Sequence, residues 1–195
     1  MEPGPIAIFF AAIFTSNILL VNFLGMCSFL SISRELKASV GLGLAVTFVL
    51  TTTSLIAYLL NQYVLVPLEM EHLRYIVFIV VIAAFVQLVE IVIERISPVL
   101  YVNLGIFLPL ITVNCAILGS LLFLVIREYD LWQSLAFGAG SGLGWMLAIV
   151  ALAGIRQRMK YSKVPAALEG PGIALIITGL MSLAFVGFSG MIPIQ

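Results

Sequence analysis

Long apolar runs alternate with short polar breaks along the whole chain. A helix that crosses a bilayer needs roughly 20 apolar residues, and six runs reach that length. They cover residues 6–32, 38–63, 74–94, 99–126, 131–154 and 171–191. Charged side chains gather in the breaks, as in the Arg-Glu-Tyr-Asp stretch at 127–130. The pattern predicts an all-α polytopic membrane protein with about six transmembrane helices.

Composition points the same way. Hydrophobic residues make up 63% of the 195 residues and charged residues only 9%, whereas soluble domains are about 25% charged. Six helices leave no length for a soluble domain, so we expect a single membrane domain over residues 1–195. The net charge of zero argues against a nucleic-acid partner. Residues 1–5 lack the basic stretch of a cleavable signal peptide, so we expect the first apolar run to be retained.

The basic residues predict the orientation of these helices. Lys and Arg are enriched in the cytoplasmic loops of membrane proteins. Seven of the nine basic residues fall in the odd-numbered connections, namely Arg34, Lys37, Arg95, Arg156, Arg158, Lys160 and Lys163. The side that holds them is expected to be cytoplasmic. Both termini of this multi-pass membrane protein are therefore predicted to face outward, away from the cytoplasm.

The two halves of the chain are weakly similar. The stretch that ends at Cys27 has a counterpart in the stretch that ends at Cys115, and a Gly-Leu-Gly step lies in the helix that follows each. Three helices per half is an odd number, so the second half must be inverted in the membrane. We therefore expect two inverted three-helix repeats, at roughly 6–96 and 99–191. Such repeats place a functional site near the midplane, on interrupted helices.

Helices 1 and 4 of this pattern are expected to be interrupted. The first run contains Asn17 and Gly25, and the fourth contains Gly105, Pro109 and Asn114. Proline removes a backbone donor, and a broken helix survives in lipid only against protein or a cavity. The asparagines could line a polar path or could satisfy the broken backbone. Ordinary kinks are the alternative, but a cysteine just beyond each break favours a functional site.

The two cysteines are the strongest candidates for chemistry. A single cysteine in a membrane helix is usually a small buried hydrophobe. Equivalent places in inverted halves would instead bring Cys27 and Cys115 close together. Two such thiols could form a disulfide, which has little rationale here, or bind a metal. Iron–sulfur clusters take four cysteine thiolates, and the only histidine, His72, is expected in an outward loop. A metal centre would therefore need ligands from another chain.

A second candidate lies on the third predicted helix. Gln87, Glu90 and Glu94 fall at i, i+3 and i+7, on one face near the cytoplasmic end. Ionisable groups inside membrane spans are costly and often functional, and hard cations prefer oxygen ligands. Glu90 and Gln87 are thus candidates for an ion path. The alternative is an interfacial carboxylate that reaches the headgroups or pairs with a basic loop residue.

Two stretches carry a family resemblance. Gly-Met-Cys-Ser-Phe-Leu at 25–30 and Leu-Gly-Ile-Phe-Leu-Pro-Leu-Ile-Thr-Val-Asn-Cys-Ala-Ile-Leu-Gly at 104–119 resemble signatures of one family. It comprises the D and E subunits of the Na⁺-translocating NADH:quinone oxidoreductase and the A and E subunits of the Rnf complex. The resemblance covers essentially the whole chain.

Features of two family branches are present. Residues 144–155 and 159–166 are similar to the quinone-reductase E subunit, whereas residues 66–68, 73–74 and 97–101 are similar to the Rnf A subunit. The prediction is the quinone-reductase E subunit. The A subunit of the Rnf ferredoxin:NAD⁺ complex is the alternative.

The resemblance implies a function and a cofactor. Cys27 and Cys115 match the family's cysteines and would supply half the ligands of an intramembrane two-iron, two-sulfur (2Fe-2S) cluster, with the paralogous D subunit supplying the rest. The cluster would carry electrons across the membrane, from an NADH-oxidising flavoprotein subunit towards FMN-bearing subunits and ubiquinone, coupled to Na⁺ export. A similar acidic position to Glu90 occurs in the family. This translocase subunit would hold no catalytic residue and no complete active site.

Two hypotheses from other classes remain open. A small secondary transporter also suits inverted repeats and broken helices; it would work in isolation and be indifferent to cysteine loss. A purely structural subunit would let its complex assemble without iron at this site. A single iron bound by four thiolates would fit two cysteines per chain as well as a two-iron cluster does.

Overall fold

A computed structural model describes residues 4–67, 73–96, 111–162, 165 and 170–188. These residues form helices and connecting turns, with no strand among them. The helices are α1 (Pro5–Ile13), α2 (Met26–Ile32), α3 (Leu36–Leu60) with its π-helical continuation η1 (Asn61–Leu65), α4 (Arg74–Ile96), α7 (Cys115–Ile126), α8 (Leu131–Met159) and α9 (Pro171–Val186). The all-α prediction is confirmed for the described part of the chain.

Three of the helical segments are long and apolar enough to cross a membrane. They are Leu36–Leu65, Arg74–Val92 and Leu131–Met159. The first predicted run is interrupted as expected, because residues 14–25 separate α1 from α2. In the fourth run the backbone breaks at residues 113–114, directly before α7. The predicted breakers Gly105 and Pro109, together with His72, lie outside the described residues.

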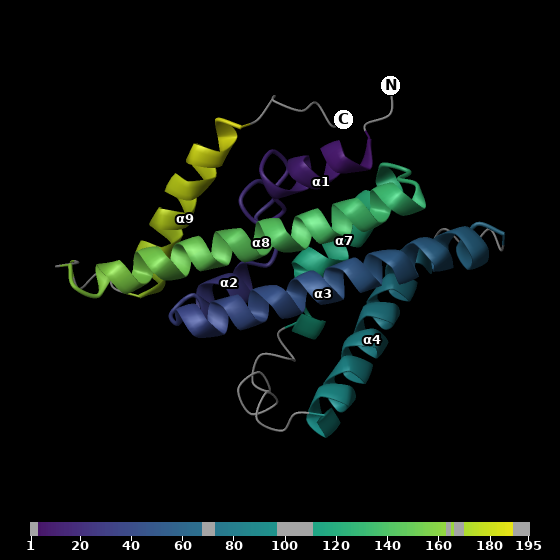
Figure 1. Cartoon of the computed structure of the whole chain (residues 1–195), viewed down its shortest axis with the longest axis horizontal. Coiled ribbons are helices and arrows are strands. Elements are labelled where there is room, and N and C mark those ends of the chain that lie inside the picture. The colour runs from purple at the N-terminus through teal and green to yellow at the C-terminus, as the bar shows by residue number, and fades with distance from the viewer. Residues whose placement is uncertain (1–3, 68–72, 97–110, 163–164, 166–169, 189–195) are drawn as a thin grey trace.

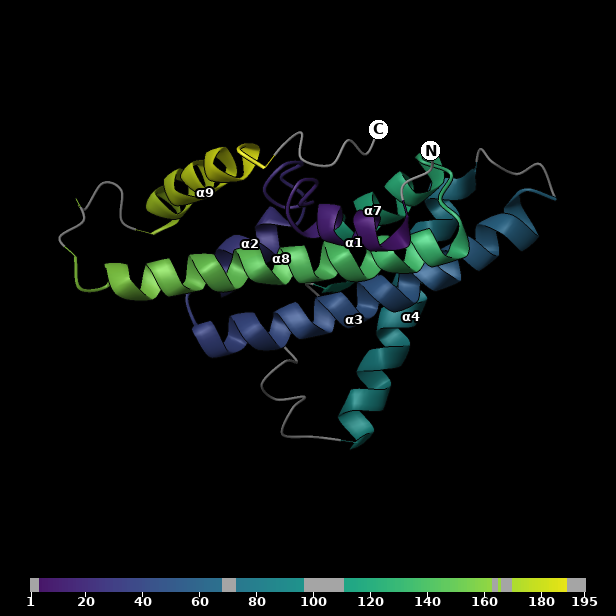
Figure 2. The ribbon, with the colours of Figure 1, turned by 45° about the horizontal axis from the view of Figure 1, so that its top comes forward.

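Helices α3 and α8 form the central pair and lie side by side in Figures 1 and 2. Glycines let them approach closely. A Cβ added to Gly142 would lie 2.6 Å from the Thr47 Cα, and one added to Gly43 would lie 2.5 Å from the Met146 Cγ. Small residues at i and i+4 are the usual means of close helix packing in membranes. The Gly-Leu-Gly steps therefore serve helix packing.

A second glycine face of α8 receives α1. A Cβ on Gly140 would lie 2.6 Å from the Phe9 carbonyl oxygen, and one on Gly144 would lie 3.0 Å from the Ala12 carbonyl oxygen. Gly138 and Gly142 thus face α3, whereas Gly140 and Gly144 face α1. Helix α8 therefore packs against both α1 and α3. Its fully buried residues include Trp145, Ala148, Ile149 and Leu152.

Helices α3 and α8 are antiparallel, so the start of α3 and the end of α8 lie at the same end of the pair. Arg34 and Lys37 are thereby placed at the same end as Arg156 and Arg158. The predicted end of this helix at residue 154 is wrong, because α8 continues to Met159. The Arg156 Nη1 donates to the Leu30 carbonyl at 3.0 Å and to the Ser33 Oγ at 2.7 Å, which ties this end of α8 to the C-terminal end of α2.

Helix α4 projects from the bundle in both views (Figures 1 and 2). Only 17% of the most apolar stretch of this helix is buried within the protein. Large apolar side chains on it, such as Ile76, Val80 and Leu88, are exposed. Such a contiguous apolar face needs a non-aqueous neighbour. Lipid or another membrane protein is a neighbour of that kind.

The break after α1 is held by one fully buried side chain, Asn17. Its Nδ2 donates to the carbonyls of Ile13, at 3.0 Å, and Gly144, at 2.9 Å. Its Oδ1 accepts from the N–H groups of Leu19, at 3.1 Å, and Leu20, at 3.2 Å. All four hydrogen-bonding positions of the amide are used. Asn17 thus satisfies the broken backbone, which was one of its two predicted roles.

We expect Asn17→Leu to lower the free energy of unfolding by about 3 kcal/mol or more, because buried backbone groups that lose a partner cost about 1–3 kcal/mol each. The measurement is the apparent melting temperature of the purified complex in detergent. Asn22→Leu is the matched control, since Asn22 is exposed. Equal melting temperatures for the two variants would contradict the role assigned to Asn17.

Candidate functional site

The two cysteine segments meet in the structure, although they are far apart in the sequence. Cys27 is the second residue of α2, and Cys115 is the first residue of α7. The main-chain N–H of Gly25 donates to the Cys115 Sγ at 2.9 Å. The expectation that the halves bring these segments together agrees with this contact.

Both thiols are free and exposed. This excludes a disulfide between them in the structure as described, and neither cysteine is the buried hydrophobe that a lone membrane cysteine usually is. Val21, Phe23 and Val113 are also exposed, the last at 73%. The cysteines therefore lie in an open, largely apolar part of the surface, where ligands from a second chain can reach them.

The turn before α2 requires glycine at position 25. Gly25 has a φ of +83°, in the left-handed region that favours glycine. A Cβ there would lie 2.6 Å from the Trp145 Nε1, and 3.1 Å from both the Ala116 Cβ and the Asn114 Oδ1. The Gly25 carbonyl accepts from the Phe29 N–H at 3.1 Å. The close packing around Gly25 therefore sets the position and the direction of its N–H group.

Asn114 is the N-cap of α7. Its Oδ1 accepts from the Ala116 N–H at 3.0 Å, as the preferred N-cap residues do. This arrangement places Cys115 in the first turn of α7, where the helix dipole favours negative charge. Asn114 thereby satisfies the broken backbone, as Asn17 does in the other half.

The two sulfurs are soft donors of the kind that bind iron and iron–sulfur clusters. Among the residues that the structure describes, no group of three or more His, Cys, Asp or Glu could hold a metal ion. The donor set is therefore chemically suitable but incomplete within one chain. Cys27 and Cys115 fit half of a four-thiolate site, with the remaining ligands coming from outside.

The candidate ion-path residues lie elsewhere, on α4. Gln87 is exposed and Glu90 is half-buried. Glu94 follows on the same helix, but its side chain is outside the described part. The role of this face remains a prediction from the sequence.

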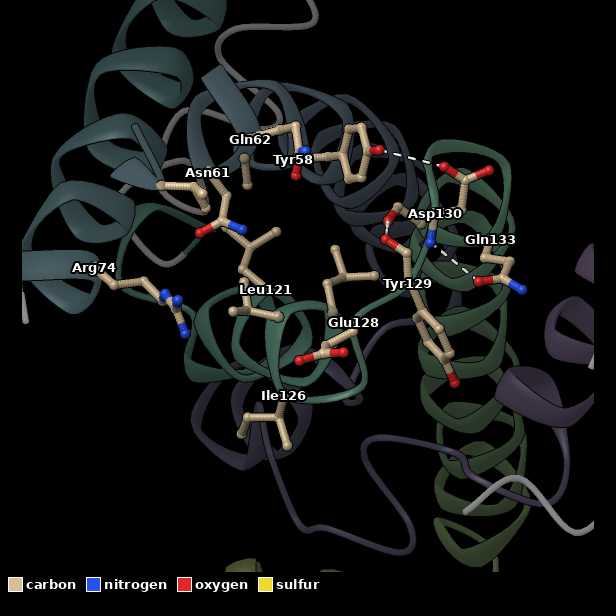
Figure 3. Close-up of a pocket in the computed structure, with 15 residues that line it drawn as sticks. Tyr58, Asn61, Gln62, Arg74, Leu121, Ile126, Glu128, Tyr129, Asp130 and Gln133 are labelled. Atoms are coloured by element: carbon tan, nitrogen blue, oxygen red, sulfur yellow. Dashed lines mark hydrogen bonds between the residues drawn. The ribbon is translucent and has the colours of Figure 1, made fainter. Parts of the chain in front are cut away.

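A polar cavity of about 640 Å³ lies at the opposite end of the α3–α8 pair from Arg156. Figure 3 shows Tyr58 of α3, Arg74 of α4, and Glu128 and Asp130 of the turn between α7 and α8 around it. The Tyr58 hydroxyl donates to the Asp130 Oδ1 at 3.3 Å. The cavity also borders η1, whose Asn61 Oδ1 is buried with no hydrogen-bond partner among the described residues.

Neither this cavity nor the contacts of Gly25 were predicted from the sequence. The charges at 127–130 predict only a break between helices, and nothing in the residues of η1 signals a π-helix. A signal did exist for Gly25, because a glycine two residues before a candidate ligand permits close backbone approach. Trp145 is fully buried and serves packing.

Comparison with known proteins decides the family. The family described as "Rnf-Nqr subunit, membrane protein" matches residues 5–192. The chain belongs to the Rnf-Nqr family. Two Rnf-Nqr relatives, each named as the E subunit of a Na(+)-translocating NADH-quinone reductase, are similar over nearly their whole length. That of Psychromonas ingrahamii is 51% identical and that of Yersinia enterocolitica 50%, each covering 95% of this chain and 97% of the relative.

A relative from the other branch is equally similar. The A subunit of the Na(+)-translocating ferredoxin:NAD(+) oxidoreductase complex of Acetobacterium woodii is 50% identical, also over 95% of this chain and 97% of its own. The predicted resemblance to this family, and to the quinone-reductase E subunit within it, is confirmed. Overall identity does not separate the two branches, which matches the mixed features in the sequence of this Rnf-Nqr protein.

Proposed function

We propose that this chain is an integral membrane subunit of a Na⁺-translocating NADH:quinone oxidoreductase. It carries electrons across the membrane through a 2Fe-2S cluster, for which Cys27 and Cys115 provide half the ligands and a paralogous subunit provides the rest. The observation that carries this proposal is the contact between the Gly25 N–H and the Cys115 Sγ, which brings two exposed cysteine segments together. The names of the relatives support the wider assignment.

In this mechanism the chain binds and positions the cluster but transforms no substrate. Cys27 and Cys115 hold it from one side, and the N-terminus of α7 stabilises negative charge at Cys115. The cluster, when bound, supplies a one-electron relay. An NADH-oxidising flavoprotein subunit delivers electrons, and FMN-bearing subunits pass them on towards quinone. Na⁺ export is coupled to this electron flow.

We place the chain in the bacterial inner membrane as one membrane domain over residues 1–195. It has six spans, arranged as inverted repeats at roughly 6–96 and 99–191, and both termini are periplasmic. The clustering of basic residues at one end of α3 and α8 supports this orientation. The two interrupted cysteine segments support the repeat.

The experiment that tests the assignment is purification of the intact complex through an affinity tag on this chain. We expect the preparation to oxidise NADH with quinone as acceptor, and Na⁺ to stimulate the rate. Oxidation of reduced ferredoxin with NAD⁺ instead would assign the chain to the Rnf branch, which the Acetobacterium woodii relative favours. Transport by the isolated chain, without redox partners, would favour a secondary transporter.

Glu90, with Gln87, is proposed to lie on the path of Na⁺. We expect Glu90→Gln to raise the Na⁺ concentration for half-maximal stimulation of quinone reduction about tenfold, the equivalent of about 1.4 kcal/mol, because the charged oxygen ligand is lost. Glu35→Gln is the matched control, since Glu35 is an exposed carboxylate at the start of α3. An unchanged Na⁺ dependence in Glu90→Gln would leave it an interfacial carboxylate.

A further inference from the structure

We infer that the Gly25 main-chain N–H is a positioning group for the cluster and holds its reduction potential higher than the four thiolates alone would. The inference rests on the proposed function, because it needs the cluster on Cys27 and Cys115. It starts from the 2.9 Å separation between the Gly25 nitrogen and the Cys115 Sγ. Hydrogen bonds to the sulfurs are among the factors that set the potential of an iron–sulfur cluster.

The packing around Gly25 keeps this N–H in place. Gly25 is buried, and Trp145, Ala116 and Asn114 surround the side where a Cβ would be. Trp145 is fully buried and Asn114 is 2% exposed, so neither can move aside into solvent. On the other side of the turn, the Ser28 Oγ donates to the Gly25 carbonyl at 3.1 Å. The donor is therefore preorganised by two halves of the chain that meet at α8.

The direction of the effect follows from charge. Reduction adds an electron to the cluster and its sulfurs, and a donor that points at one of them stabilises the added negative charge. A hydrogen bond to a charged group is stronger than one between two neutral groups. Loss of the Gly25 donor should then lower the ratio of reduced to oxidised cluster about tenfold at a fixed ambient potential, a shift of about 59 mV for one electron.

The test uses the intact complex from cells grown with ¹⁵N-glycine, and pulsed EPR of the reduced cluster. We expect a ¹⁵N coupling from glycine in the wild type that is lost in Gly25→Ala. A Cβ at position 25 cannot fit beside Trp145 without displacing the turn. Gly154→Ala is the matched control, because a Cβ there meets nothing within 4 Å. It should keep both the coupling and the potential.

The double variant Gly25→Ala/Trp145→Leu tests whether Gly25→Ala acts only by misfolding the protein. It removes the indole ring that the new Cβ would otherwise clash with. We expect this variant to assemble with iron and to keep a lowered potential, since alanine remains strained at φ +83°. A cluster signal in the wild type that shows no glycine coupling would overturn the inference but leave the cluster assignment standing. An unchanged reduction potential in both Gly25→Ala and the double variant would have the same meaning. A wild-type complex with no cluster signal would instead overturn the proposed function and this inference with it.

Discussion

Cys27→Ala and Cys115→Ala are each expected to remove the cluster from a complex that still assembles. Quinone reduction should fall by about a hundredfold or more, because loss of an outer-shell partner of a metal site alone costs about 10–100-fold and a lost ligand costs more. Assembly should survive, because both thiols are exposed in the chain and their removal leaves no cavity in its core. The measurements are iron and acid-labile sulfide per complex, low-temperature EPR and the rate of quinone reduction.

Ser31→Ala is a suitable control for the cysteine variants, because Ser31 is also an exposed residue of α2. It should retain iron, sulfide and activity. Loss of about two irons and two sulfides in each cysteine variant supports the 2Fe-2S assignment, whereas loss of one iron without sulfide would indicate a single-iron centre. Unchanged iron and unchanged quinone reduction would end the electron-carrier proposal and favour the transporter and scaffold hypotheses.

Gly142→Ala is expected to destabilise the chain by about 3 kcal/mol, the upper part of the range for overpacked cores. The new Cβ would lie 2.6 Å from the Thr47 Cα, which belongs to the backbone of α3 and cannot rotate away. The central pair would have to separate, and buried α3 residues such as Val46 and Leu50 would lose contacts. The measurements are the yield and the apparent melting temperature of the purified complex.

Gly154→Ala is the matched substitution on the same helix. A Cβ there has open space around it, and alanine is favoured over glycine in a helix interior by about 0.5–1 kcal/mol. The two Gly→Ala changes in α8 are therefore expected to act in opposite directions. A fall in melting temperature of similar size for both would show that the close approach at Gly142 does not govern stability.

The sequence by itself determined the class of the protein and the identity of its candidate ligands. Hydrophobic length is a local property that the bilayer imposes, so the spans that became α3, α4 and α8 could be found without any tertiary information. The break after α1 was also predictable, because Asn17 is a polar residue inside an apolar run and a broken backbone there needs polar partners. Cys27 and Cys115 stood out since they are the only cysteines and follow equivalent breaks.

Only the tertiary structure decided what surrounds the cysteines. The hydrogen bond from Gly25 to Cys115 joins residues 90 positions apart, and Trp145 packs against the same turn. Such contacts arise from three-dimensional close packing, which residue patterns along the chain do not encode. The cavity beside Tyr58 and Asp130 and the extension of α8 to Met159 arise in the same way. Local hydrophobicity thus sets where helices form, whereas the glycine faces of α8 set which of them touch and where a site can be built.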